Sequence, residues 1–119
     1  MKIYATRDSV HPGDDCDAPH ATTIDLPGEI SVNAAVEKIL ASRYLARISG
    51  GNATWSVMSA IPIAVVAQQW DAPRYYHLYD GLDRLDVVAG TLRLHFNYHA
   101  QIDPEIVYRI FWGMRLRAV

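Results

Sequence analysis

Residues 54–70, TWSVMSAIPIAVVAQQW, constrain the fold more than any other stretch of the chain. The pattern predicts two apolar strands joined by a tight connection at Ser59-Ala60-Ile61-Pro62, with the second strand running from Ile63 to Gln69. That second strand is apolar on both faces until Gln68. Two-sided apolarity is typical of a central strand covered on both sides. The hairpin therefore needs paired neighbouring strands and apolar layers on both of its faces.

Other strands are predicted on both sides of this hairpin. Residues 2–8 and 21–26 have strand character, and we expect them to pair across the Pro- and Gly-containing loop between them. Residues 91–99 alternate most clearly, with an apolar face that should lie on the core and a polar face that should lie in water. The apolar face carries Leu92, Leu94, Phe96 and Tyr98, and the polar face carries Arg93, His95, Asn97 and His99. Residues 71–90 fit a short edge strand or a turn of helix.

Two amphipathic helices complete the pattern. The first is capped by Ser31 or Asn33 and is stopped by Gly50-Gly51-Asn52. The second begins at Asp103-Pro104-Glu105, which supplies a cap, a proline at the first helical position and an acid in the first turn. Its expected buried stripe is Ile106, Val107, Ile110, Phe111 and Met114.

The sequence thus predicts a single α+β domain over residues 1–119. The order is strand–strand–helix–strand–strand–(strand)–strand–helix. We expect about five strands in a mostly antiparallel sheet, with both helices on one face.

Composition narrows the cellular setting. The chain has 119 residues and a net charge of −2, and its longest apolar run is far shorter than the roughly 20 residues of a membrane span. The first residues lack the apolar segment of a signal peptide. Cys16 is the single cysteine, which excludes an internal disulfide and fits a reducing compartment. We expect a cytoplasmic protein that neither binds membranes nor needs a cofactor.

Charge is unevenly distributed along the chain. Residues 1–30 hold six acidic and two basic residues. A general affinity for nucleic acid needs a basic face, which this layout does not suggest. Acidic and tyrosine-rich segments are instead suited to a protein partner, because anions steer basic partners and tyrosine is enriched at interfaces. The residues expected to make that contact are Asp14, Asp15, Asp17, Tyr79, Asp80 and Asp83.

Histidines support a competing interpretation. His11 and His20 share a loop with three aspartates, a set that can bind a divalent metal, although the spacing matches no known metal motif. His95 and His99 lie beside Arg93 on the polar strand face, and imidazoles with an arginine are the acid–base and phosphate-binding groups of small ribonucleases. However, four residues of strand separate the two histidines by about 13 Å, so the pair needs a third partner. A small RNA-cleaving enzyme or a metal-binding domain is therefore the alternative.

Several segments resemble a family of small bacterial proteins. The matching stretches are YATRDSV, GDD-x-DAPH and GGNATWSV…IPIAVVAQQW, within residues 3–20 and 50–70. They are similar to immunity proteins of contact-dependent growth inhibition and polymorphic-toxin loci. The resemblance implies stoichiometric, non-catalytic binding to the C-terminal domain of a cognate toxin, and it assigns no residue a role. A nuclease is the expected toxin, since nucleases are often basic and would complement the acidic segments.

A third hypothesis is a self-associating subunit. The hairpin at residues 54–70 could offer a free strand edge to another copy.

Overall fold

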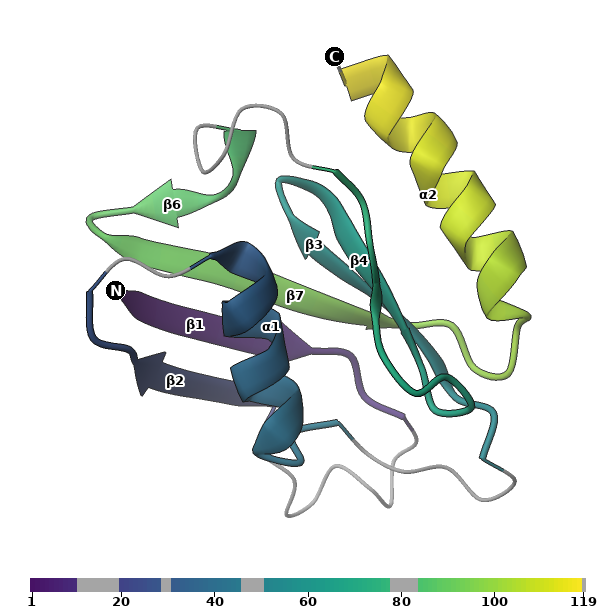
Figure 1. Ribbon diagram of the computed structural model, residues 1–119, viewed down its shortest axis with the longest axis horizontal. Helices are drawn as coiled ribbons and strands as arrows, with labels where there is room; N and C mark the ends of the chain where they lie inside the picture. Colours follow the sequence, from purple (N-terminus) through teal and green to yellow (C-terminus); the bar gives the residue numbers. More distant parts are fainter. Residues whose placement is uncertain (11–19, 29–30, 46–50, 78–83, 119) are drawn as a thin grey trace.

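The computed structural model describes residues 1–10, 20–28, 31–45, 51–77 and 84–118 (Figure 1). The chain is an α+β domain with strands β1 (Lys2–Arg7), β2 (Ala21–Asp25), β3 (Thr54–Ser59), β4 (Ile61–Ala67), β5 (Arg74–Tyr75), β6 (Val87–Val88) and β7 (Thr91–Tyr98), and with helices α1 (Val32–Ala41) and α2 (Pro104–Ala118). The predicted fold class is confirmed, with seven strands among the described residues rather than about five.

The sheet is mixed but mostly antiparallel. Its order is β2-β1-β7-β3-β4-β5, and β6 pairs with the start of β7. β1 and β2 pair antiparallel, as the sequence predicts. The exception is β1 with β7, which run parallel from Lys2 opposite Thr91 to Arg7 opposite Phe96. The first strand therefore lies beside one that is almost 90 residues away in sequence.

The β3–β4 hairpin has the predicted two-sided burial. It turns at Ala60, whose φ of 64° is left-handed, and its register shifts after Val57, so that Pro62 pairs with Met58. A bulge is one of the few sheet positions that suits proline, which has no N–H to donate. β7 flanks β3 and β5 flanks β4. Because β5 pairs only with Ala64 and Val65, the hairpin is flanked along β3 but only in part along β4, and self-association through this edge stays a prediction.

Helix α1 covers one face of the sheet. Ser31 caps it by accepting a hydrogen bond from the Ala34 N–H at 3.1 Å. Its buried side chains pack into the main core together with residues of β1, β3, β4 and β7. Those helix residues are Val32, Ala35, Val36 and Ile39. The face that α1 covers carries Leu92, Leu94 and Phe96, as alternation in β7 predicted.

This helix ends earlier than the glycines at residues 50–51 suggested. Ser42 terminates it, because its hydroxyl donates to the Ile39 carbonyl at 2.6 Å, and Arg43 then adopts a φ of 60°. The departure from helix takes Tyr44 back to the sheet, where its hydroxyl donates to the His20 carbonyl at 2.6 Å. Tyr44 is thus a core residue outside the helix.

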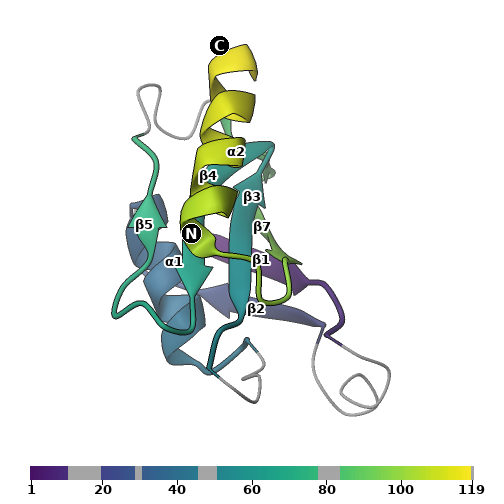
Figure 2. The same ribbon diagram turned by 90° about the vertical axis from the view of Figure 1, so that its right-hand side faces the viewer.

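Helix α2 packs on the opposite face, so the expectation of both helices on one face was wrong. Val107 contacts Val65 and Tyr76, and Tyr76 stacks on Tyr108 with ring centroids 4.5 Å apart. Val65 points away from its neighbours Ala64 and Val66, which belong to the α1 side. Figure 2 shows α2 running alongside β3 and β4. The helix therefore covers only one part of its sheet face.

Burial along α2 also differs from the prediction. Val107 is buried and Phe111 half-buried, as expected. Ile106, Ile110 and Met114 are instead exposed by 49%, 58% and 43%. The helix has apolar residues around a wide arc, and the narrow contact with β4 and β5 covers only one side of that arc.

Within residues 71–90, the described parts 71–77 and 84–90 each contain one short strand. β5 is the edge strand expected near Tyr75, and β6 extends the sheet beside β7. Among the described residues, neither helix has the length and apolarity needed to cross a bilayer.

The turn at Ala60 provides a test of the hairpin. A left-handed φ disfavours residues with a Cβ by about 1–2 kcal/mol. Glycine relieves this strain but also gives the unfolded chain more entropy, which offsets part of the gain. Ala60→Gly should therefore raise the free energy of unfolding by up to about 1 kcal/mol. Ala64→Gly, at a fully buried position of β4, should lower it by at least about 1 kcal/mol. Urea titrations measure both. Destabilisation by both substitutions would contradict this account of the turn.

Candidate functional site

The six residues predicted to contact a partner lie outside the described residues. The described residues that flank the two segments are attached at two different points of the sheet. Arg7 N–H donates to the His20 carbonyl beside the Phe96 end of β7, whereas Arg93 N–H donates to the Asp86 carbonyl near its start. Arg93 and Phe96 are three residues apart on β7, so these two attachment points lie about 10 Å from each other along the strand.

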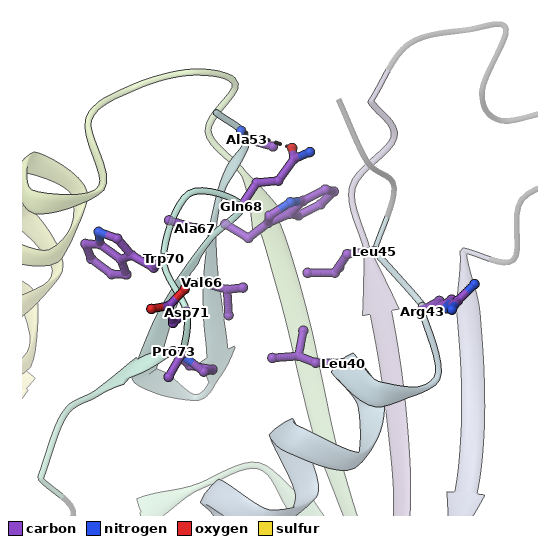
Figure 3. Close-up of a pocket in the computed structure, with 12 residues that line it drawn as sticks. Leu40, Arg43, Leu45, Ala53, Val66, Ala67, Gln68, Trp70, Asp71 and Pro73 are labelled. Carbon is purple, nitrogen blue, oxygen red and sulfur yellow. Dashed lines mark hydrogen bonds between the residues drawn. The ribbon is translucent and has the colours of Figure 1, made fainter. Parts of the chain in front are cut away.

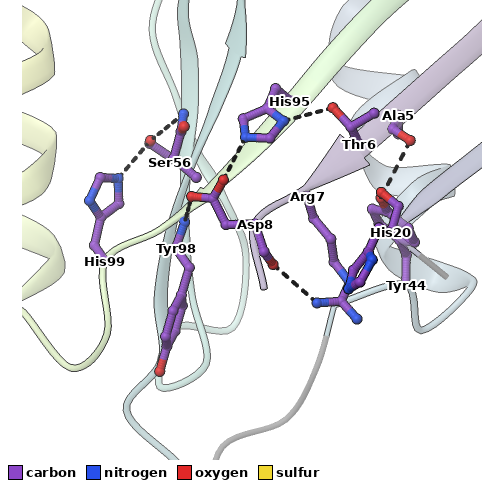
Figure 4. A network of polar contacts seen from close by, with 11 residues as sticks. Ala5, Thr6, Arg7, Asp8, His20, Tyr44, Ser56, His95, Tyr98 and His99 are labelled. Atoms are coloured by element: carbon purple, nitrogen blue, oxygen red, sulfur yellow. Dashed lines mark hydrogen bonds and ion pairs between the residues drawn. The ribbon is translucent and has the colours of Figure 1, made fainter. Parts of the chain in front are cut away.

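A polar network lies on the part of the sheet face that α2 leaves uncovered. Thr6 and His95 are partners in the parallel β1–β7 register. Thr6 Oγ1 lies 2.7 Å from His95 Nδ1, and His95 Nε2 lies 2.9 Å from an oxygen of Asp8 (Figure 4). The His95 and Asp8 side chains are 39% and 43% exposed. A hydroxyl, an imidazole and a carboxylate are therefore connected in one accessible chain of hydrogen bonds.

Asp8 holds this network in place. Its second oxygen accepts from the Tyr98 N–H at 3.0 Å, just beyond the end of the β1–β7 ladder. With Asp8 as an acceptor at Nε2, neutral His95 carries its proton there and presents the Nδ1 lone pair to Thr6. The carboxylate thus orients a ring nitrogen that can accept a proton.

A second histidine lies nearby under α2. His99 Nε2 is 2.7 Å from Ser56 Oγ, and Asn97 donates to the same hydroxyl at 3.3 Å. The Ser56 hydroxyl can donate to His99 or accept from it, according to which ring nitrogen of His99 carries the proton. The His99 ring packs 5.4 Å from that of Phe111. Burial lowers the pKa of His99, opposed by the smaller influence of the Asp8 charge, so the ring is neutral at physiological pH.

Ser56 and His99 therefore have a structural role. Ser56 is fully buried, so a substrate has no access to its hydroxyl. The predicted exposure of this strand face to water is confirmed at Arg93, which is exposed, whereas His99 and Asn97 are half-buried.

A shallow hollow adjoins His95 and Thr6. Its volume is about 170 Å³, and its lining includes Tyr4, Met58 and Asp86. Arg93 Nε lies 3.7 Å from Asp86 on the same surface, with both side chains about half exposed. Small-molecule sites usually measure about 300–1,000 Å³. This hollow is the size of one side chain.

A larger groove lies between α1 and the end of the β3–β4 hairpin (Figure 3). Its volume is about 730 Å³. Polar and apolar surface contribute about equally to its walls, where Leu40 and Leu45 face Val66 and Pro73, and Arg43 and Asp71 supply charge. Trp70, also in the lining, is covered by the Arg74 guanidinium at 4.4 Å from its ring centroid. The size lies within the range of small-molecule sites.

On the α1 side of the sheet, Arg7 and Tyr44 form a buried polar contact. The Arg7 guanidinium lies 5.8 Å from the Tyr44 ring centroid and donates to the Asp8 carbonyl at 3.2 Å. Burial raises the pKa of Tyr44 to about 12, although the Arg7 charge opposes it. Tyr44 remains protonated and acts as a hydrogen-bond donor.

The histidines of the competing interpretation do not converge. His11 lies outside the described residues, and His20 lies at the start of β2, where its carbonyl meets Tyr44. His95 and His99 have separate partners, as the strand spacing predicted. No cluster of three or more metal-binding side chains occurs in the described part of the chain.

Sequence reasoning missed Asp8 and Thr6. It placed Asp8 at the end of the first strand and expected His95 to act with Arg93. Only the parallel β1–β7 pairing brings Asp8 and Thr6 to His95. The one signal for Asp8 was an acid immediately after a strand, which is too common to single out.

The geometry defines a small α+β domain with an open polar sheet face. Comparison with protein-family models, curated proteins and solved structures finds no match to this chain.

The lowered pKa of His99 gives stability a pH dependence. As pH falls through the unfolded pKa of about 6.5, the unfolded chain takes up a proton that folded His99 resists, so stability is full above this pH and declines below it, by at most about 1.4 kcal/mol per pH unit. His99→Gln keeps an acceptor for Ser56 but does not titrate. Urea unfolding from pH 8 to 5 should show a shallower decline for His99→Gln than for the wild type. The exposed His77→Gln is the control, and equal slopes for wild type and His99→Gln would refute the assignment.

Proposed function

We propose that this chain is a cytoplasmic immunity protein that binds and neutralises a bacterial toxin domain. The resemblance of residues 3–20 and 50–70 to immunity proteins motivates the proposal. A nuclease domain is the toxin class that best fits the acidic character of residues 1–30.

The observation that carries the proposal is the uncovered half of the sheet face. It is a polar surface with one hollow of about 170 Å³, which fits a side chain projecting from a protein better than a small substrate. Asp86 in the lining is paired with Arg93 at 3.7 Å, so a basic side chain of the partner would share this carboxylate with Arg93, and Tyr4 supplies an aromatic face for a cation.

The acidic character of residues 1–30 supports the same class of partner. Asp8 N–H donates to the Phe96 carbonyl, so the chain leaves the sheet at the His95 end of the network. Anions next to a docking surface raise the rate at which a basic partner associates and orient its approach. Asp14, Asp15 and Asp17 would act in this way.

Co-purification tests the proposal directly. The chain should form a stoichiometric complex with the C-terminal domain of a toxin encoded next to its gene and should abolish that domain's activity. Asp14, Asp15 and Asp17 changed together to Lys should slow association, more strongly at low salt. Failure to bind that domain at micromolar concentration would refute the proposal.

A matched pair of charge reversals tests the docking surface. Asp86→Lys should weaken the complex at least tenfold, which corresponds to about 1.4 kcal/mol, because a cation would then oppose the basic partner at the hollow. Asp71→Lys makes the same charge change at the larger groove beside α1 and should leave affinity within about threefold. Isothermal titration calorimetry measures both, and equal losses would place the toxin elsewhere.

The Thr6–His95–Asp8 network favours one second candidate, an RNA-cleaving acid–base site. A ribose 2′-hydroxyl could replace the Thr6 hydroxyl at His95 Nδ1 and lose its proton there as its oxygen attacks the adjacent phosphorus. The P–O5′ bond then breaks, solvent water protonates the leaving 5′-oxygen, and Asp8 stabilises the imidazolium. Arg93, two residues from His95 on the same strand face, is about 7 Å away and could hold the phosphate.

Metal-free cleavage of a single-stranded RNA separates the two candidates. An enzyme should lose at least about 100-fold of its rate in His95→Ala. It should keep most of its rate in Thr6→Val, because Thr6 only occupies the substrate position. Wild-type cleavage no faster than that of His95→Ala would exclude this candidate.

A further inference from the structure

The Thr6 hydroxyl has the surroundings of a nucleophile. Its Oγ1 lies 2.7 Å from His95 Nδ1, and His95 Nε2 lies 2.9 Å from a carboxylate oxygen of Asp8 (Figure 4). Activated hydroxyls in proteins share this arrangement, in which a base is within hydrogen-bond reach of the nucleophile and a third group orients the base. Thr6 and His95 are register partners and Asp8 directly follows β1, so the sheet itself fixes the geometry.

The hydrogen bonds run in the direction that proton transfer from Thr6 needs. An ionised Asp8 only accepts, so neutral His95 carries its proton on Nε2 and leaves the Nδ1 lone pair for Thr6. Thr6 therefore donates its hydroxyl proton to a base in the resting protein. Ser56 beside His99 is fully buried, whereas Thr6 and His95 both line the hollow of about 170 Å³. A small substrate can therefore reach this hydroxyl.

Arg93 supplies a positive charge next to the Thr6 hydroxyl. When a hydroxyl adds to a carbonyl group, negative charge develops on the carbonyl oxygen, and N–H donors stabilise that charge. Arg93 lines the same hollow and is the register partner of Tyr4, two residues from Thr6 on β1. Its Cα thus lies about 8 Å from that of Thr6, within reach of a long side chain. The guanidinium is 3.7 Å from Asp86 and makes no hydrogen bond with a described residue, so its N–H groups are available.

We propose that Thr6 is an acyl acceptor, with His95 as its base and Arg93 as the group that stabilises the negative oxygen. The substrate class is a small acyl ester with a good leaving group, because the hollow is the size of a short acyl chain. Thr6 Oγ1 bonds to the acyl carbon as His95 Nδ1 takes the hydroxyl proton. The bond from the acyl carbon to the leaving oxygen then breaks, and His95 gives the proton to that oxygen.

Water completes the cycle. A water molecule attacks the acyl carbon of the Thr6 ester and gives a proton to His95, the bond to Thr6 Oγ1 breaks, and Thr6 regains the proton. The net reaction consumes only the ester and water and yields an acid and an alcohol. Thr6 is a branched alcohol on a strand paired on both sides, and its methyl group crowds the acyl carbon. The second half of the cycle is therefore slow, and the acylated protein accumulates.

Acetylation by p-nitrophenyl acetate tests the proposal. In a Cys16→Ser background no thiol competes for the reagent. The tryptic peptide of residues 3–7 should gain the mass of one acetyl group, and fragmentation should place that group on Thr6 rather than Tyr4. His95→Gln keeps a polar side chain but removes the base, and it should slow acetylation of Thr6 at least tenfold.

A matched pair of substitutions separates Thr6 from other reactive groups. Thr6→Val should release p-nitrophenol no faster than His95→Gln does, and Thr6→Ser should react at least as fast as the wild type. Thr23→Val makes the same change at an exposed threonine of the neighbouring strand β2 and should leave the rate unchanged. An unmodified Thr6 in the wild type, or release that persists in Thr6→Val but not in His95→Gln, would overturn the proposal.

Asp8→Asn tests the orientation of the base. The Asn oxygen is needed by the Tyr98 N–H, so its amide nitrogen faces His95 Nε2. The ring proton then moves to Nδ1, which can no longer accept from Thr6. Acetylation should fall at least tenfold, and heteronuclear NMR of the imidazole should show the changed tautomer. An unchanged rate with the tautomer changed would contradict the proposal. Thermal unfolding checks that each variant is folded, and the assays contain neither toxin nor RNA, so their outcome is separate from both candidate functions.

Discussion

The parallel pairing of β1 with β7 is the contact on which the rest of the structure depends. β7 lies between β1 and β3, so it joins the N-terminal hairpin to the β3–β4 hairpin and makes one sheet of two. It also aligns Ile3 and Ala5 with Leu92 and Leu94 beneath α1. Without this pairing the main core would be divided between two small sheets, and a two-stranded hairpin alone is at best marginally stable in water.

The same pairing builds the candidate site. Thr6 and His95 meet only because they are register partners, and Asp8 reaches His95 and the Tyr98 N–H because it directly follows the ladder. Hydrogen bonds to a charged group contribute about 1.5–3 kcal/mol each when well formed, and less where solvent screens them, as here. Asp8 therefore stabilises the sheet end as well as orienting a histidine. A stabilising role accounts for this network without catalysis, and for that reason toxin binding is the first proposal.

Local patterns in the sequence predicted those elements whose own residues show, by their apolar and polar pattern, which sides are buried. Alternation identified β7, two-sided apolarity identified β4 as a covered strand, and Asp103-Pro104 marked the start of α2. Local periodicity does not indicate which distant strands pair. The parallel β1–β7 register, and the contact of Asp8 with His95 that depends on it, could therefore not be foreseen.

Helix α2 shows a second limit of local patterns. Its row of Ile106, Ile110 and Met114 is as apolar as the row that contacts the sheet. Periodicity shows that a helix has an apolar side, but it does not show which of two apolar sides the sheet covers. The predicted contact residues cannot be compared in this way, because Asp14, Asp15, Asp17, Tyr79, Asp80 and Asp83 lie outside the described residues.

The central place of β7 has a consequence for how the chain reaches its native state. Until residues 91–98 are synthesised, the β1–β2 and β3–β4 hairpins share no strand and can form only separately. Contacts between residues so far apart in sequence slow folding, because the chain between β1 and β7 must close into a loop before strand pairing stabilises that loop. The last strand to be made is thus the one that allows the first strand to fold, and the apolar faces of both hairpins stay exposed in the meantime.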